Sequence, residues 1–323
     1  MKKTLILIVV VIVVLSGFYY FFLAAPQSRA ESERFVVSLG ESRVQIIHNL
    51  AQNGFVKNSL GINLAFWLRG KFGNISPGGY KISKSGNVFK VAGALLGESY
   101  MKWVVVPEGL RKEETANLLQ AALNWNDQVK DEFLNAYATS SLGNDYKEGV
   151  YFPDTYLLPK DETGFEIARR FINRFNEKFA PYADGFAKQD VKWTTALKIA
   201  SLVERETGNA SDMPLIAGII WNRLLRGMVL QIDAAIQYAR GDIGQGYWAP
   251  LQSGDLKINS SYNTYLHKGL PPTPISNPGL TAILAVLNPA KTDCLYYLHD
   301  DRGDIHCAAT YAGHKINIEK YLK

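Results

Sequence analysis

The stretch Trp193-Thr-Thr-Ala-Leu-Lys-Ile-Ala-Ser-Leu-Val-Glu-Arg-Glu-Thr207 decides how the second half of the chain folds. Its pattern predicts one helix, and the turns that precede the two glutamates are almost wholly apolar. A helix that is apolar on nearly all sides packs inside a protein. We therefore expect a core helix that ends in two acidic side chains, at least one of them against a buried wall.

The two acidic side chains are Glu204 and Glu206. At about 100° per residue they lie about 200° apart and cannot share a helix face. Helical phase alone does not choose which of them is buried. A carboxyl group against an apolar wall has a raised pKa and can act as a general acid near neutrality. The alternative is an exposed helix end in which Arg205 neighbours both carboxylates.

Further helices are expected on the C-terminal side of this stretch. Asp212 can cap a helix that stops at Gly227, and Asp233 can cap another that ends near Gly241. The stretch Asp242 to Pro278 is rich in prolines, glycines, aromatics and amides, and unstructured loops of such length are commonly functional. A helix over 280–287, a hairpin over 294–309 and a helix ending at Tyr321 are expected to complete the chain.

Neutral polar and aromatic side chains gather in this region. Aromatic faces cover the apolar side of a pyranose ring, while amides and hydroxyls bond its hydroxyl groups, so this composition favours sugar binding. Each residue taken singly has a structural alternative, such as capping or a turn. The candidate substrate-binding residues are Asn222, Gln231, Gln237, Tyr262, Asn263, Thr264 and Tyr265.

The first part of the chain predicts a small domain of strands and helices over residues 35–105. A strand over 34–39 precedes a helix capped by Ser42, and helices over 60–69 and 88–96 flank a short strand at 80–82. The expected fold class is therefore α+β throughout: a small α+β domain, and then a mainly helical α+β domain over 106–323 with a long loop and a β-hairpin.

The N-terminus predicts a membrane helix. Residues 4–25 are 22 uncharged residues, enough for a helix of about 33 Å, which matches one bilayer core. Lys2 and Lys3 in the tail (residues 1–3) and an aromatic belt at the far end orient the body outside the cytoplasm. Residues 26–34 are polar and read as a tether. A cleaved signal peptide is the alternative.

Several classes of function are excluded by composition and motifs. The net charge of +5 is too small to indicate nucleic acid as a partner. The chain has no Walker loop, no G-x-G-x-x-G behind a strand, no G-x-S-x-G and no H-E-x-x-H. Its five histidines have no ligand spacing. We therefore expect neither a metal nor any other cofactor.

The two cysteines, Cys294 and Cys307, fall on the two strands of the expected hairpin. A register that pairs residue 299 with residue 302 sets them opposite each other outside the cytoplasm, so a disulfide is a candidate.

Several motifs in order resemble those of the endolytic murein transglycosylases, the YceG-like family. They are Val106-Pro-Glu-Gly-Leu110, Tyr151-Phe-Pro-Asp-Thr-Tyr156, Ser201-Leu-Val-Glu-Arg-Glu-Thr207, Ala217-Gly-Ile-Ile-Trp-Asn-Arg-Leu-Leu-Arg-Gly-Met228, Leu230-Gln-Ile-Asp233, Tyr262-Asn-Thr-Tyr265, Gly269-Leu-Pro-Pro272, Asn277-Pro-Gly279 and Asn288-Pro-Ala-Lys-Thr292. The resemblance implies a LysM-like domain over 35–105, a catalytic domain over 106–323, and Glu206 as the catalytic acid.

The resemblance also implies the reaction and its place. The family cleaves the bond between N-acetylmuramic acid (MurNAc) and N-acetylglucosamine (GlcNAc) in nascent peptidoglycan strands and leaves a 1,6-anhydro-MurNAc end. The implied partners are glycan strands, the inner (cytoplasmic) membrane and peptidoglycan synthases. A hydrolytic muramidase, with Glu204 or Asp233 as second carboxylate, and a non-catalytic peptidoglycan-binding scaffold are the alternatives.

Overall fold

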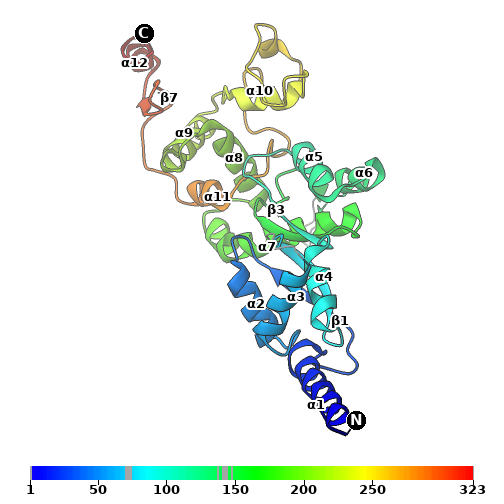
Figure 1. Cartoon of the computed structure of the whole chain (residues 1–323). Helices are drawn as coiled ribbons and strands as arrows, with labels where there is room; N and C mark the ends of the chain where they lie inside the picture. The colour runs from blue at the N-terminus through cyan, green and yellow to red at the C-terminus, as the bar shows by residue number, and fades with distance from the viewer. Residues whose placement is uncertain (1, 70–74, 137, 140–144, 147, 323) are drawn as a thin grey trace. The chain divides into compact units, whose positions relative to one another are not determined.

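The computed structural model describes residues 2–69, 75–136, 138–139, 145–146 and 148–322. The chain divides into two compact units (Figure 1). Unit 1 comprises Met1–Val104, Ala122–Asn124 and Thr155–Glu162, and unit 2 comprises Val105–Ala121, Trp125–Asp154 and Thr163–Lys323. Both strands and helices are present, which agrees with the expected α+β class.

Unit 1 is built on a four-stranded sheet with the order β1-β2-β3-β6. The strands are β1 (Ser32–Val37), β2 (Gly78–Ser83), β3 (Met101–Val105) and β6 (Thr155–Pro159). β1 and β2 are antiparallel, and Phe35 pairs with Tyr80. Residues 32–34 thus belong to β1 rather than to the predicted tether. Their side chains are polar and exposed, so the apolar pattern starts only at Phe35.

Three short helices supply the rest of the unit 1 core. They are α2 (Arg43–Gln52), α3 (Ser59–Leu68) and α4 (Val88–Leu96). Ser42 caps α2 as predicted, because its side chain accepts a hydrogen bond from the Gln45 amide in a capping box. The apolar faces of the helices meet the sheet in one buried cluster that includes Leu50, Phe66 and Tyr80.

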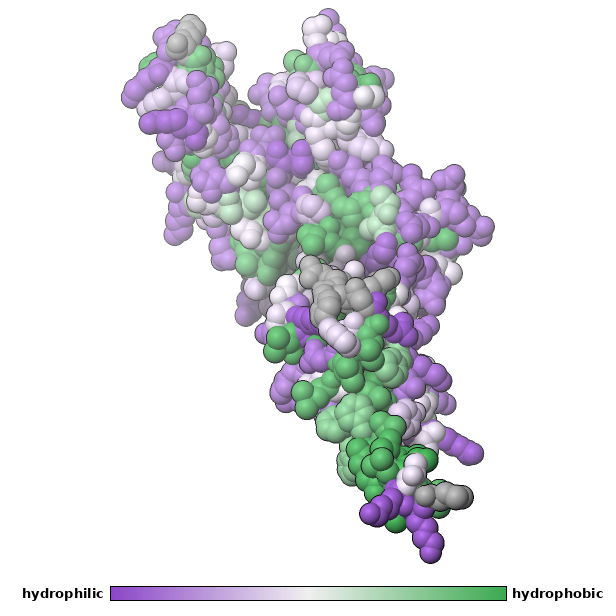
Figure 2. Space-filling view, in the orientation of Figure 1, coloured by the Kyte–Doolittle hydropathy of each residue, from purple (hydrophilic) through white to green (hydrophobic). Residues whose placement is uncertain are grey.

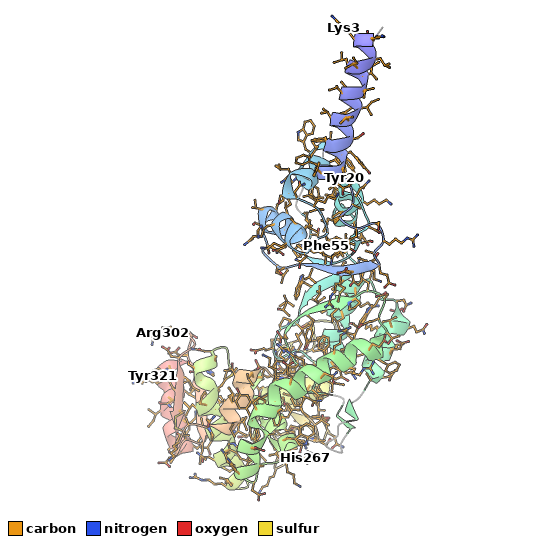
Figure 3. All side chains as sticks on the ribbon, turned by 90° about the horizontal axis from the view of Figure 1, so that it is seen from below. Lys3, Tyr20, Phe55, His267, Arg302 and Tyr321 are labelled. Atoms are coloured by element: carbon orange, nitrogen blue, oxygen red, sulfur yellow. A yellow bond between two sulfur atoms is a disulfide. The ribbon has the colours of Figure 1, made fainter. Side chains whose placement is uncertain are left out.

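The N-terminal apolar segment is helical. α1 (Lys2–Phe18) continues as the π-helix η1 (Tyr19–Leu23), and this is the one helix in the described residues that is long and apolar enough to cross a membrane. Figure 2 shows its surface as almost continuously hydrophobic, and Figure 3 labels Lys3 and Tyr20 toward its two ends. Lys57 and Asn58 donate hydrogen bonds to the carbonyl oxygens of Tyr20 and Phe21, which ties the end of η1 to the start of α3.

Unit 2 opens with elements that sequence analysis did not assign. They are α5 (Lys112–Leu123), α6 (Asp127–Asn135), the strand pair β4 (Ala138–Thr139) and β5 (Asp145–Tyr146), and α7 (Gly164–Lys188). α7 buries a line of phenylalanines, Phe171, Phe175, Phe179 and Phe186. It packs against α6, α8 and α11.

The central helix of unit 2 is α8 (Trp193–Glu206), which contacts α7, α9 (Met213–Leu225), α10 (Asp233–Arg240) and α11 (Leu280–Leu287). Every residue from Ile199 to Val203 is buried. The expected core helix is therefore present; it begins at Trp193 as predicted and ends at Glu206, one residue before the predicted end at Thr207. The 3-10 turns η2 (Ala210–Asp212) and η3 (Asp255–Lys257) complete this region, and residues 242–278 otherwise form the predicted long loop.

The chain ends in a hairpin, β7 (Tyr296–His299) and β8 (Ile305–Ala308), and in the helix α12 (Tyr311–Tyr321). Cys294 and Cys307 are joined by a disulfide. The predicted register is wrong, however, because His299 pairs with Ile305 rather than with residue 302. Asp300 accepts hydrogen bonds from the amides of Arg302 and Asp304, which widens the turn and shifts the pairing.

Candidate active site

Glu206 is the last residue of α8, and its partly buried carboxylate meets the hairpin. The Tyr297 hydroxyl donates a hydrogen bond of 2.5 Å to Glu206 Oε2. Burial raises the pKa of Glu206, and this outweighs the hydrogen bond from Tyr297, which lowers it. A larger fraction of this carboxyl group is therefore protonated near neutrality than in an exposed glutamate.

Arg223 on α9 is a buried cation near Glu206. Its Nε donates to the carbonyl oxygen of Leu295 at 2.6 Å, and a terminal nitrogen donates to the carbonyl oxygen of Leu230. Its charge lowers the pKa of Glu206, whereas the charge of Asp233 raises it. The carboxylate thus lies between a buried positive group and an exposed negative one.

The N-terminus of α10 forms another side of the site. The backbone amide of Ala234 lowers the pKa of Glu206 by hydrogen bonding to its carboxylate. Asp233 does not cap this helix as expected, because Ile232 occupies the cap position and no side chain bonds there. The Asp233 carboxylate instead accepts a 2.5 Å hydrogen bond from the Tyr265 hydroxyl. Asp233 therefore does not cap α10, and it is close enough to Glu206 for its charge to raise the pKa of that carboxyl group.

Backbone pairing between two loop segments holds the start of α10 in place. The amide of Gln231 donates to the carbonyl oxygen of Thr264, and that of Ile232 donates to Thr264 Oγ1. Gln231 has a φ of 52°, a left-handed conformation that costs energy for a residue with a side chain. The strained turn directs the chain into α10 beside Glu206.

Glu204 faces a different part of unit 2. Its Oε2 accepts a hydrogen bond of 3.0 Å from the amide of Gly279. Burial raises its pKa, and the nearby Glu108 raises it further. A Cβ atom on Gly279 would lie 1.8 Å from Glu108 Oε1, so a larger residue there would displace the Glu108 side chain from its position. The two glutamates of the motif thus point to different neighbours, as their helical phase predicted.

The Asn277-Pro-Gly279 segment is held by a buried polar network. Asn277 exchanges backbone hydrogen bonds with Gly109 and Leu110, and its side-chain amide donates to Glu148 Oε1 at 3.0 Å. Glu148 is buried, which raises its pKa to about 8. This network fixes the loop on which Glu204 depends.

Most of the predicted sugar-binding side chains are already bonded to the protein. The amide nitrogens of Asn222, Gln237 and Asn263 each donate to two backbone carbonyl oxygens, and Tyr262 bonds Thr273. Thr264 is buried against Ile232. Gln231 is exposed, and Tyr265 lies beside Asp233. Of the seven candidates, these two remain best placed to meet a ligand at Glu206.

Sequence analysis missed Tyr297 and the central position of Arg223. Tyr297 is separated from Glu206 by 91 residues, and nothing local in the hairpin indicates that contact. The one signal for Arg223 is its place in the quoted Ala217–Met228 motif. In the described ranges, no cluster of three or more His, Cys, Asp or Glu side chains could hold a metal ion.

Comparisons with known proteins point to the same family that the motifs resemble. Residues 35–320 match the model of the YceG-like family. The chain is 34% identical over 200 residues to the endolytic murein transglycosylase of Bacillus subtilis, covering 61% of this chain and 54% of that protein. A protein of the same description from Streptococcus pneumoniae strain D39 is 34% identical over 177 residues, 54% of this chain and 32% of that protein.

The chain thus spans about half, or less, of the curated relatives that it matches. A crystal structure of a YceG-like protein from Listeria monocytogenes has the same fold, with a TM-score of 0.58 and 24% identity. The structural match covers 90% of this chain and 100% of the Listeria protein's chain. The chain belongs to the YceG-like family.

Proposed function

We propose that this chain is a membrane-anchored endolytic lytic transglycosylase that cleaves the MurNAc–GlcNAc bond within peptidoglycan strands. The observation that carries the proposal is the carboxyl group of Glu206, whose burial raises its pKa at the end of a core helix. A carboxyl group of this kind is the group that a glycosidic bond needs as its acid. The description of the relatives as endolytic murein transglycosylases supports the same substrate.

One carboxyl group suffices for the proposed reaction. Protonated Glu206 gives its proton to the glycosidic oxygen, and the C1–O bond breaks as an oxocarbenium-like state develops on MurNAc. The 6-hydroxyl of the same sugar then forms a bond to C1, and its proton returns to Glu206. The products are a GlcNAc end and a 1,6-anhydro-MurNAc end, and no water is consumed.

The neighbours of Glu206 suit both halves of this cycle. The Tyr297 hydroxyl and the Ala234 amide stabilise the carboxylate once its proton has gone. The negative charge of Asp233 favours the protonated acid before the reaction and a positive charge at C1 during it. We assign substrate contacts to Gln231 and Tyr265, and a role in shaping the loop to the other five candidates.

The position of Asp233 also supports a second candidate, a hydrolytic muramidase. Hydrolysis needs a second carboxylate that can activate water. Asp233 is exposed, does not cap α10, and acts electrostatically on Glu206. Only the chemistry of the products separates the two candidates.

The proposed anchor is the α1–η1 helix, and unit 1 would be a LysM-like domain held at the membrane. Leu60, Trp67 and Leu68 on α3 are exposed at 69%, 59% and 56%. They follow Lys57 and Asn58, which bond the end of η1, so a lipid interface would cover them. An enzyme at the inner membrane would act beside the synthases that make the strands, and these are the proposed partners.

We expect Glu206→Gln to keep the fold and to lower the rate of strand cleavage by about 10²- to 10⁴-fold, because an amide cannot serve as the acid. Glu204→Gln is the matched control, since its amide oxygen can still accept the bond from Gly279. Release of fragments from purified glycan strands measures both rates. A larger loss in the Glu204 variant would reverse the assignment of the two glutamates.

We expect Tyr297→Phe to move the alkaline limb of the pH–rate profile upward by about one to two pH units. Activity requires protonated Glu206 and falls as pH rises through its pKa. The Tyr297 hydroxyl stabilises the carboxylate, so its removal raises the pKa of Glu206. The expected rise corresponds to the free energy of one charge-assisted hydrogen bond. Tyr296→Phe is the control. A limb that stays in place or moves downward would contradict this role for Tyr297.

Cleavage in H₂¹⁸O should give muramic ends that carry no label and are one water lighter than reducing ends, as mass spectrometry can show. The 6-hydroxyl of the same sugar is the nucleophile with the highest effective concentration. Labelled reducing ends would establish the hydrolase instead. In that case Asp233→Asn should abolish cleavage. If the enzyme is a transglycosylase, the Asp233→Asn variant should still form the 1,6-anhydro product.

Full-length protein should stay in the membrane pellet after carbonate extraction, because the Lys2–Leu23 helix is long and apolar enough to span the bilayer. The N-terminal peptide, identified by mass spectrometry, serves as the internal control for processing. A mature N-terminus near Pro26, or release of the intact chain, would support the signal-peptide alternative.

A further inference from the structure

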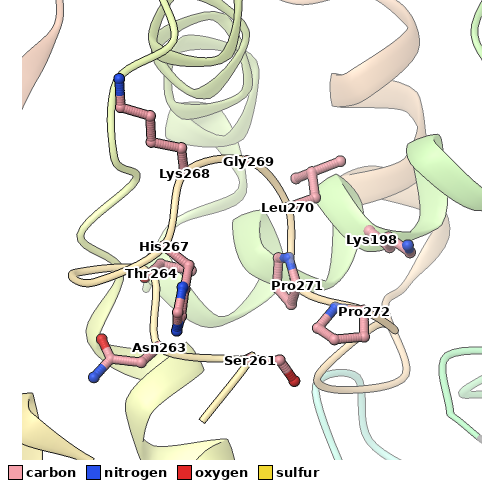
Figure 4. Close-up of a pocket in the computed structure, with 10 residues that line it drawn as sticks. All are labelled: Lys198, Ser261, Asn263, Thr264, His267, Lys268, Gly269, Leu270, Pro271 and Pro272. Carbon is pink, nitrogen blue, oxygen red and sulfur yellow. The ribbon is translucent and has the colours of Figure 1, made fainter. Parts of the chain in front are cut away.

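A pocket of about 370 Å³ lies in unit 2 between α8 and the loop that follows Tyr262. Three of its lining residues, Lys198, His267 and Lys268, are of basic type, and none of the described lining residues is acidic. Figure 4 shows Lys198 at one end and His267 toward the other, with Pro271 between them. The Lys268 side chain extends away from the pocket, so its ammonium group takes no part in it.

Lys198 is the unusual member of this set. Its side chain projects from the core helix α8 and is partly buried, and burial lowers its pKa. Within the described parts of the chain, no carboxylate lies within ion-pair distance of its ammonium group. A partly buried cation without a counter-ion costs folding free energy. Such a cost is characteristic of a group that meets its partner in a ligand.

Helix α8 and the segment around Thr264 connect this pocket with the site at Glu206. Lys198 and Glu206 are eight residues apart on α8, which is about 12 Å along the helix axis. Thr264 lines the pocket, and its hydroxyl oxygen accepts the amide of Ile232 directly before Asp233. One loop segment therefore forms a wall of the pocket and also supports the start of α10 beside Glu206.

The proposed substrate carries anionic groups at a matching distance. Muramic acid in peptidoglycan bears a short peptide on its lactyl group, and that peptide has free carboxylates. An extended peptide covers about 3.3–3.6 Å per residue, so three or four residues match the rise of about 12 Å along the helix axis that separates Glu206 from Lys198. A muramoyl residue held at Glu206 can thus place a peptide carboxylate at Lys198.

We propose that this pocket is a subsite for the acidic stem peptide of the muramoyl residue, with Lys198 as the counter-ion for one of its carboxylates. The proposal rests on the proposed function, because that function puts the muramoyl residue at Glu206. His267 and the exposed Ser261 supply further polar contacts along the pocket.

The test is direct binding of a soluble muramyl peptide to the full-length protein in detergent, measured by calorimetry. This ligand has no glycosidic bond, so its binding does not depend on cleavage. We expect the free-carboxylate peptide to bind at least about tenfold more tightly than the same peptide with its carboxylates amidated. Lys198→Met should abolish this difference, and Lys198→Arg should keep most of it.

Lys268→Met is the matched control, because it removes a lysine whose ammonium points away, and it should behave as the wild type. The melting temperature of each variant verifies that it is folded. Equal binding of the two peptides by the wild type, or wild-type binding by Lys198→Met, would overturn the subsite. Loss of strand cleavage in Glu206→Gln addresses the proposed function separately, so failure of one proposal is distinguishable from failure of the other.

Discussion

The buried guanidinium of Arg223 is the interaction on which the arrangement around Glu206 depends. From α9 it donates to the carbonyl oxygen of Leu230, which leads into α10, and to that of Leu295, which leads into β7. Guanidinium cannot lose its charge, so removing it would leave two buried acceptors unsatisfied. One cation therefore fixes two segments that are distant in sequence. Those segments carry the Ala234 amide and the Tyr297 hydroxyl, the two donors to Glu206.

The positions of the two glutamates on α8 give them different surroundings. Because Glu204 and Glu206 lie on opposite sides of α8, each meets a different loop. Glu204 Oε2 accepts a hydrogen bond from the amide of Gly279, and the adjoining Asn277 donates to buried Glu148, so this carboxylate is tied to a network within the protein. Glu206 accepts hydrogen bonds from a tyrosine hydroxyl and from a backbone amide at a helix N-terminus, and it lies in the electrostatic range of exposed Asp233.

Local signals predicted the fold well where they were strong, and long-range contacts limited the rest. The helix over 280–287 and the cap at Ser42 follow from apolar spacing and capping chemistry. α7 was missed although Thr163 and Glu166 form a capping box, and Pro181 inside it argues locally against a helix. At the site, helical phase left Glu204 and Glu206 open, the family resemblance assigned the acid to Glu206, and no local signal indicated Tyr297. Amide side chains such as Asn222 were predicted to bind sugar, because sequence does not distinguish an amide that meets a ligand from one that bonds a backbone carbonyl.

In the proposed reaction a single acid serves at both steps, and the charges around Glu206 suit that double role. Tyr265 donates to Asp233, so that carboxylate is held in one position near Glu206. Its negative charge raises the pKa of Glu206, and in the proposed reaction the same charge would stabilise the positive charge that develops on the sugar. As the proton leaves Glu206, Arg223 and Tyr297 become the stronger influences, because they favour the carboxylate. Groups with opposite effects on the protonation of Glu206 thus act on one carboxyl group, and this balance suits an acid that, in the proposed reaction, gives up its proton and takes another back.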